Sequence, residues 1–236
     1  SNARINVDAG TLSMTNATAA IALGNYTLNT GVASNTNFNI SGLLTGSGAL
    51  TKDNDGTITL SGANTGYSGA ITIDKGVMNI QNANALGTTD VATTVTSGAA
   101  LQLQNNITVP EQNIYINGTG VALNGAIRNM SGANALTGTV NLTTSSRINV
   151  DAGILSMTTG TIALGANSLN TGVFSGTSVE SQYDFDLSIT DDFFAGDYGA
   201  DFTVTGTVGQ VITRTKALQG TSADVTYAIS KITSSN

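Results

Sequence analysis

Residues 50–80 read LTKDNDGTITLSGANTGYSGAITIDKGVMNI, and this stretch decides the fold. Within it, residues 57–60, 70–73 and 77–80 alternate small polar residues with aliphatic ones, which is the period of a strand with one buried face. Between these strands, residues 61–64 and 74–76 contain the Gly, Asn and Asp that tolerate the positive φ of a tight corner. The pattern predicts a chain that winds round and round, each turn laying its strands on the turn before.

The same stretch carries a recognisable motif. Its residues are Leu50, Lys52, Gly56-Thr57, Thr59-Leu60-Ser61-Gly62-Ala63-Asn64-Thr65, Tyr67-Ser68-Gly69, Gly76 and the later Ala85-Leu86-Gly87. In these residues the chain resembles the autotransporter-associated β-strand repeat, a family found in passenger regions of bacterial proteins that reach the surface through an outer-membrane pore. Gly66 departs from the family pattern, and we expect it to lengthen one corner without moving a strand. The resemblance implies a β-helical fold and an extracellular or cell-surface location, with outer-membrane attachment through parts outside this sequence.

Composition excludes several classes of protein. The 236-residue chain contains no Cys, His or Trp, and only 10% of its residues are charged, against about a quarter in ordinary globular chains. Without Cys and His, zinc, haem, iron–sulfur, thiol and Ser-His-Asp chemistry are excluded. The net charge of −7 and the eight Lys and Arg residues argue against a nucleic-acid partner, whose phosphates need clustered cations. The sequence contains no apolar run long enough for a membrane-spanning helix.

Internal repeats organise the chain. The segment RINVDAGTLSM at residues 4–14 returns as RINVDAGILSM at residues 147–157, at an offset of 143 (147 minus 4). Residues 21–24 and 28–32 return at 162–165 and 169–173, at an offset of 141 (162 minus 21). A fainter echo repeats the SGAN of residues 61–64 at residues 131–134, at an offset of 70 (131 minus 61). Repeats of this kind indicate a tandem array of like turns.

Residues 4–176 are predicted to form a succession of short strands, because no segment keeps the spacing of apolar residues that an amphipathic helix requires. Outside the opening stretch the predicted strands centre on Ile5/Val7, Leu12/Met14, Ile21/Leu23, Tyr26/Leu28, Phe38/Ile40, Leu101/Leu103, Ile107/Val109, Ile114/Ile116, Val121/Leu123, Val140/Leu142, Ile148/Val150 and Ile162/Leu164. At roughly twenty residues per turn, about nine turns fit. We therefore predict an all-β chain whose residues 4–176 form a right-handed parallel β-helix. Residues 1–3, Ser-Asn-Ala, are interpreted as a cloning scar.

The composition changes at about residue 177. Seven of the fifteen acidic residues lie between Glu180 and Asp201, together with five of the twelve Phe and Tyr residues. Strict alternation at residues 183–189 and 225–229 is typical of an antiparallel sheet. We predict that residues 177–236 form a small antiparallel β unit or a cap on the end of the β-helix.

One acidic cluster is a candidate metal site. Asp184 and Asp186 share one face of a predicted strand, and Asp191-Asp192 follows shortly after it. Carboxylate oxygens at this spacing suit calcium, whereas the alternative interpretation is the solvated face of a half-buried strand. No catalytic residue and no other cofactor is predicted.

A second acidic segment is interpreted as a turn. Asp53-Asn54-Asp55-Gly56 resembles the start of a calcium-binding EF-hand loop, but Gly62 stands where the bidentate Glu would be required. Asp8 and Asp151 occupy the same place in two copies of a repeat, which is typical of a structural corner.

These observations predict a non-enzymatic structural or adhesive segment of a bacterial surface-exposed or secreted protein, acting as a rigid, monomeric stalk or passenger. Its exposed Asn, Thr and Ser rows are expected to hydrogen-bond weakly to glycans or proteins of a host or neighbouring cell. Two alternatives stay open. The first is a polysaccharide-degrading enzyme, because such enzymes use aspartates on β-helices. The second is a calcium-dependent adhesion module within residues 177–236.

Overall fold

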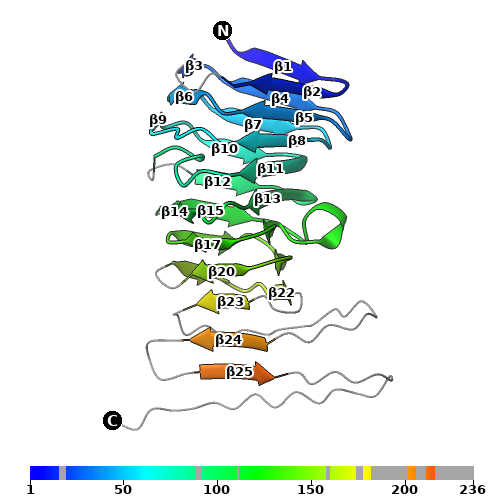
Figure 1. Cartoon of the computed structure of the whole chain (residues 1–236), viewed down its shortest axis with the longest axis vertical. Coiled ribbons are helices and arrows are strands. Elements are labelled where there is room, and N and C mark those ends of the chain that lie inside the picture. The colour runs from blue at the N-terminus through cyan, green and yellow to red at the C-terminus, as the bar shows by residue number, and fades with distance from the viewer. Residues whose placement is uncertain are drawn as a thin grey trace.

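The computed structural model describes residues 1–15, 20–88, 92–110, 112–157, 160–173, 178–181, 201–205 and 211–215. In these residues the chain is a stack of short strands along one long axis (Figure 1). The only helix among them is a single 3-10 turn, η1 (Val121–Leu123). The prediction of an all-β parallel β-helix is confirmed. No helix in the described ranges is long and apolar enough to cross a membrane.

Each turn of the chain adds one strand to a first sheet and one to a second sheet, and every pairing within these sheets is parallel. The first sheet consists of β1 (Ala3–Val7), β4 (Leu28–Val32), β7 (Leu50–Asp53), β10 (Ile71–Ile73), β12 (Ala92–Val95), β15 (Asn113–Ile116), β18 (Thr139–Leu142) and β21 (Thr161–Ala163). The second consists of β2 (Thr11–Met14), β5 (Asn37–Ile40), β8 (Thr57–Leu60), β11 (Gly76–Ile80), β13 (Ala99–Leu103), β16 (Ile127–Asn129), β19 (Ser146–Val150) and β22 (Leu169–Val173).

The third face of the solenoid is divided into two shorter parallel sheets. The first of these contains β3 (Ala20–Gly24), β6 (Leu43–Gly46) and β9 (Gly66–Tyr67). The second contains β14 (Thr108–Val109), β17 (Ala133–Leu136), β20 (Ile154–Met157) and β23 (Ser178–Ser181). Between them, residues 81–88 form turns in which Ala85 and Leu86 are buried. Gln112 closes this gap, because its Nε2 donates hydrogen bonds to the carbonyl oxygens of Gly87 and Thr88.

The number of turns is lower than the sequence predicts. Eight strands in the first sheet make about seven turns, so the prediction of nine is wrong. Neighbouring strands place Ile71 beside Leu50, at a sequence separation of 21 (71 minus 50), and Thr139 beside Asn113, at a separation of 26 (139 minus 113). The extra residues lie in corners, and the longest described corner between the first and second sheets runs from residue 117 to residue 126.

The alternation predicted from the sequence defines the core. Ile58, Leu60, Ile71, Ile73, Met78 and Ile80 are all at most 1% exposed, as predicted. Thr59 and Thr72 lie between them on the outer surface and are half-buried. Strand register stacks inward residues in columns, such as Phe38, Ile58 and Met78 on the second sheet. Each aliphatic side chain stabilises the fold by about 1.5–3 kcal/mol when it is buried, whereas ordering the backbone costs ~1–2 kcal/mol per residue. A turn is therefore stable only when it is stacked on its neighbours.

The two copies of the long repeat occupy different faces of the solenoid. Residues 4–14 form β1 and β2, on the first and second sheets, whereas residues 147–157 form β19 and β20, on the second sheet and the third face. The second copy therefore lies six whole turns and one further face along the solenoid from the first copy. The SGAN echo is separated by three whole turns, because residues 61–64 and 131–134 both lead from the second sheet to the third face.

Two local predictions are wrong. The alternation of Val121 and Leu123 predicted a strand, but these residues form η1, in a corner where Gly118, Gly120 and Gly125 have positive φ. Gly66 was expected to lengthen a corner, but it begins β9 and pairs with Thr45. A Cβ at Gly66 would lie 3.2 Å from Thr45 Cγ2, so a larger residue there would require the Thr45 side chain to shift by a few tenths of an ångström.

Among the described residues that follow β22 in the sequence, one pair of strands is antiparallel. β24 (Asp201–Thr205) pairs with β25 (Val211–Thr215) in antiparallel register. β23 pairs in parallel with β20. The division of the chain at residues 176 and 177 stays a prediction.

Candidate functional site

The predicted calcium site lies outside the described residues. Asp184, Asp186, Asp191 and Asp192 all fall in the range 182–200, which the structure does not describe. Within the described ranges, no group of three or more Asp or Glu residues is arranged to hold a metal ion. Calcium binding by the acidic cluster stays a prediction.

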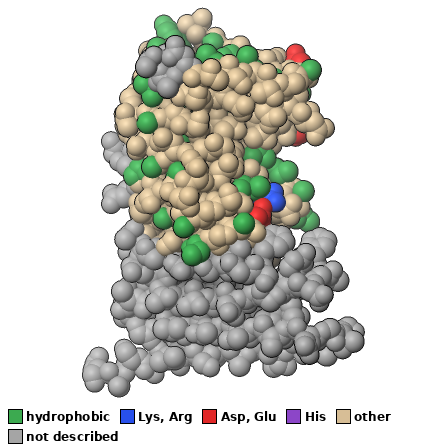
Figure 2. Space-filling view, in the orientation of Figure 1, with side chains coloured by type: hydrophobic (Ala, Val, Ile, Leu, Met, Phe, Trp, Pro, Cys, Tyr) green, Lys and Arg blue, Asp and Glu red, His purple; other side chains and the backbone are tan. Residues whose placement is uncertain are grey.

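The outer surface of the first sheet contains one row of polar, uncharged side chains, which lies between Arg4 on β1 and Ala163 on β21. Strand register aligns Asn29, Thr51, Thr72, Thr94, Tyr115 and Asn141 along the solenoid axis. Tyr115 is 37% exposed and the other members of the row are half-buried. Successive members of such a row are about 4.8 Å apart, which is the spacing between strands. Figure 2 shows one face of the molecule, on which few charged side chains interrupt the uncharged surface of the described part.

The second sheet carries a cluster of amide side chains on its outer surface. Asn79 Nδ2 donates to Gln104 Oε1 at 3.1 Å, and Gln81 Nε2 donates to Asn79 Oδ1 at 3.0 Å. Gln102 lies beside Asn79 in the strand register. Because these amides satisfy one another across neighbouring turns, they stabilise the stack, and their remaining donors and acceptors can meet a polar ligand.

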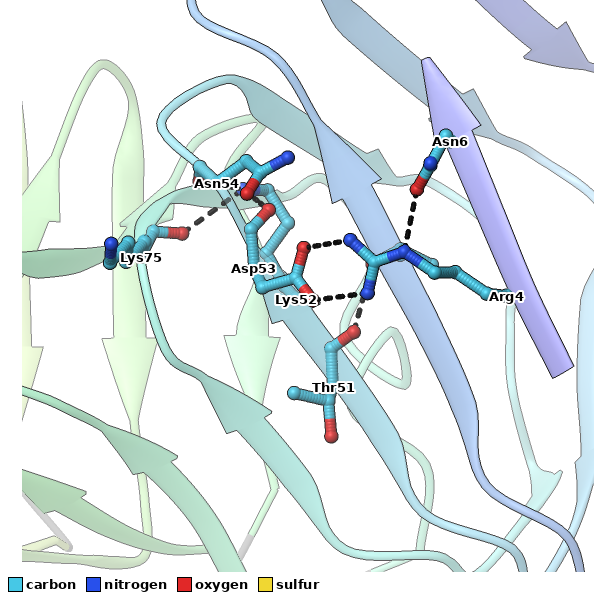
Figure 3. Close-up of polar contacts among 8 residues, drawn as sticks. Arg4, Asn6, Thr51, Lys52, Asp53, Asn54 and Lys75 are labelled. Atoms are coloured by element: carbon cyan, nitrogen blue, oxygen red, sulfur yellow. Dashed lines mark hydrogen bonds and ion pairs between the residues drawn. The ribbon is translucent and has the colours of Figure 1, made fainter. Parts of the chain in front are cut away.

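The acidic segment that resembles an EF-hand loop is a corner, as predicted. Residues 54–56 bend the chain between β7 and β8, and Asn54 has a φ of 63°. The Asp53 carboxylate accepts hydrogen bonds from both terminal nitrogens of Arg4, at 2.7 and 2.8 Å (Figure 3). Arg4 crosses over Gly31 to reach it, and a Cβ there would lie 2.5 Å from Arg4 Nη2. The carboxylate therefore links the first and third strands of the sheet.

Lys52 is buried at the same corner. Its residue is 0% exposed, and its Nζ donates to the carbonyl oxygens of Asp53, Asn54 and Lys75 at 3.0, 2.7 and 3.0 Å. These carbonyls come from two successive corners, so the ammonium group joins one turn to the next (Figure 3). Burial lowers the pKa of Lys52 to about 8, while Asp53 and Asp55 act in the opposite direction.

The second copy of the repeat carries a related ionic cluster. Arg128 forms an ion pair with Asp151 from the following turn. Asn149 Nδ2 donates to Asp151 Oδ1 at 2.6 Å, and Arg147 Nη2 donates to Asn149 Oδ1 at 3.4 Å. Asp151 thus holds neighbouring turns together at a corner, which agrees with the structural role predicted for it.

Sequence reasoning expected residues 61–64 to tolerate a positive φ and gave Asn134 no role, but neither Gly62 nor Asn64 has a positive φ. Asn64 and Asn134 share a place in the SGAN echo. Asn64 Oδ1 accepts a hydrogen bond from the Leu44 amide, and Asn134 Oδ1 accepts one from the Ile107 amide, each at 2.8 Å. Asn64 Nδ2 also donates to the Ala85 carbonyl at 2.7 Å. Both asparagines are 1% exposed. The echo itself was the signal, since a polar residue repeated at a predicted corner marks a buried hydrogen-bonding position.

No family model, no curated protein and no solved structure matches this chain. The parallel β-solenoid is compatible with the β-strand repeat that the sequence resembles.

Proposed function

We propose that this chain is a non-enzymatic, rigid stalk or passenger segment of a bacterial surface-exposed or secreted protein. The mechanism is geometric, because each turn adds about 4.8 Å of reach and the stack places polar side chains at regular intervals along its length. About seven turns give roughly 34 Å of described solenoid.

The outer row of the first sheet is the observation that carries this proposal. Its Asn and Thr side chains present short, uncharged donors and acceptors on five of six successive strands from β4 to β18, and Tyr115 occupies the remaining position. Such a row suits weak, repeated hydrogen bonding to a glycan or to a protein surface. The carboxylates of Asp53 and Asp151 are paired with arginines across turns, which favours a structural role over acid–base catalysis.

A panel of plant and bacterial polysaccharides tests the enzymatic alternative. The purified chain is expected to release neither reducing ends nor unsaturated sugars from any of them. Glycosidic hydrolysis ordinarily needs two carboxyl groups about 5–10 Å apart. Turnover that is abolished by replacing a single aspartate would refute the stalk proposal.

A cell-adhesion or glycan-array assay tests the role of the row. Replacing Thr51, Thr72 and Thr94 with Val removes the hydroxyl groups and keeps the β-branched shape, so it should weaken whatever binding the chain shows and leave its melting temperature within a few degrees. The matched control replaces Asn39 and Thr59 with Val. These residues are half-buried on the outer surface of the second sheet. Equal loss in both variants would show that the first-sheet row is not the binding surface.

A further inference from the structure

Tyr115 is an exposed aromatic side chain in the middle of the stack. It lies on β15, which has β12 on one side and β18 on the other (Figure 1). Strand register places it beside Thr94 and Asn141 in the outer row of the first sheet, and it is 37% exposed. Its hydroxyl group has no hydrogen-bond partner in the described part of the chain. A tyrosine offers an apolar ring face and a polar tip, so Tyr115 can contact a ligand through both.

The surface around Tyr115 carries no charge. The outward positions of β12, β15, β18 and β21 are Ala92, Thr94, Asn113, Tyr115, Thr139, Asn141, Thr161 and Ala163. An anionic ligand finds no cation among these side chains, and a cationic ligand finds no carboxylate. Because recognition of an ionic ligand depends on charge-assisted hydrogen bonds, this surface favours an uncharged ligand.

The amide side chains beside the ring have unused hydrogen-bonding capacity. Asn113 lies two residues before Tyr115 on the same face of the sheet, about 7 Å along the strand. It is exposed, and its side chain makes no hydrogen bond within the described ranges. The Asn141 side chain makes one contact there, a donation from Nδ2 to the Thr139 carbonyl at 3.5 Å. Since each amide offers two donors and an oxygen with two lone pairs, both can bind a polar ligand that lies over the ring.

These features match the chemistry of a pyranose sugar. One face of the sugar ring presents C–H groups, which pack on the negative face of an aromatic ring, while its equatorial hydroxyl groups point outward in the plane of the sugar. A sugar stacked on Tyr115 directs those hydroxyl groups towards Asn113 and Asn141. A protein partner fits less well, because protein interfaces concentrate their binding energy in clusters of large anchoring side chains. Tyr115 is the only aromatic residue at an outward position of the first sheet in the described strands.

We propose that Tyr115 anchors a binding site for a neutral glycan on the outer surface of the first sheet. One pyranose ring stacks on the phenol ring, and Asn113 and Asn141 hydrogen-bond to its hydroxyl groups. Further sugar units extend along the row, in which side chains recur about every 4.8 Å. This inference rests on the proposed binding role of the row, and it names the ligand class and the main contact.

Native gel electrophoresis in gels that contain a soluble polysaccharide tests the proposal. The neutral probes are hydroxyethyl cellulose, dextran and mannan, and the anionic probe is polygalacturonate. At least one neutral probe should retard the native chain, and polygalacturonate should not. Tyr115→Ala should weaken binding to the retarding probe about tenfold, whereas Tyr115→Phe keeps the ring and should bind within about threefold of the native chain. Tyr26→Ala is the matched control, because Tyr26 is 51% exposed between β3 and β4, outside the row, and its loss should leave binding unchanged.

Fluorescence gives an independent readout, because the native chain contains no tryptophan. In Tyr115→Trp, a sugar ring stacked on the indole excludes water from one face of the ring. Titration with the retarding neutral polysaccharide should therefore shift the emission to shorter wavelength. Tyr26→Trp should show no shift with the same polysaccharide.

Three results would overturn the proposal. They are the absence of retardation by all three neutral probes, equally strong retardation by polygalacturonate, and native binding by a Tyr115→Ala chain whose circular dichroism matches that of the native chain. If binding is lost on replacing Thr51, Thr72 and Thr94 but not in Tyr115→Ala, the row remains the binding surface and only its anchor is refuted. Turnover of a polysaccharide would instead refute the stalk itself.

Discussion

Lys52 gives this fold a pH dependence whose sign and size follow from the structure. Burial lowers the pKa of its ammonium group from 10.5 to about 8 in the folded chain. In the unfolded chain the same lysine titrates near its ordinary value of about 10.4. Between these two values the unfolded chain binds more protons than the folded chain, so the free energy of unfolding rises with pH.

The expected rise is about 3 kcal/mol, because each pH unit between the two pKa values contributes about 1.4 kcal/mol. The deprotonated amine still donates two hydrogen bonds, so the corner keeps most of its contacts to the three carbonyl groups. Tyr67 acts in the opposite direction at higher pH. Its burial raises its pKa, so above about pH 10 the unfolded chain loses the phenolic proton first and stability falls.

Urea unfolding at several pH values between about 7.5 and 10 measures the effect. The native chain should gain stability across this range, and Lys52→Met should show no such gain. Lys75→Met is the matched control, because it removes the same charge from an exposed side chain and should keep the gain. A native chain of constant stability, or an equal gain in Lys52→Met, would refute the reasoning.

Three further predictions concern the core, a corner and the acidic cluster. Ile71→Lys should unfold the chain, because an unpaired buried ammonium costs several kcal/mol, whereas Thr72→Lys should be mild; equal effects on thermal melting would contradict the register. Asn64→Ala should lower the free energy of unfolding by ~2–5 kcal/mol, since it orphans a buried amide and a buried carbonyl, and Asn29→Ala should change it little in the same urea titration. If the acidic cluster binds calcium, millimolar calcium should raise the melting temperature relative to EDTA, and Asp186→Asn should abolish that rise.

The core could be predicted from the sequence because its signal is local. An alternation such as that of Ile58 and Leu60, bounded by Gly-rich corners, fixes which side chains point inward whatever the neighbouring turns do. The number of turns could not be obtained in this way. It depends on corner lengths, and a corner such as residues 117–126 adds residues without adding a strand.

The buried polar residues could not be predicted from the sequence, because their hydrogen-bond partners come from other turns. Lys52 is two residues after the buried Leu50, so the alternation of the strand points its side chain inward as well. Sequence reasoning does not predict a buried lysine there, because burying an unpaired ammonium is costly. The carbonyl of Lys75, which helps to satisfy it, reaches Nζ only when the next turn stacks. In η1, Val121 and Leu123 alternate as strand residues do, but two aliphatic residues between glycines of positive φ are too few to distinguish a strand from a turn.

The repeat places a further constraint on function. Asn6 lies beside Gly31 in the first sheet, and Asn149 lies beside Gly172 in the second, so the same local pairing recurs on different faces. The fold accepts the segment in two placements, on the first and second sheets and on the second sheet and third face, because each requires only alternating inward aliphatic residues and a neighbour in register. A copy displaced by one face keeps its stacking contacts but moves its outward side chains around the axis. The stack stays intact under such a displacement, which is what a stalk requires, and the first-sheet row of polar side chains lies outside the two copies at residues 4–14 and 147–157.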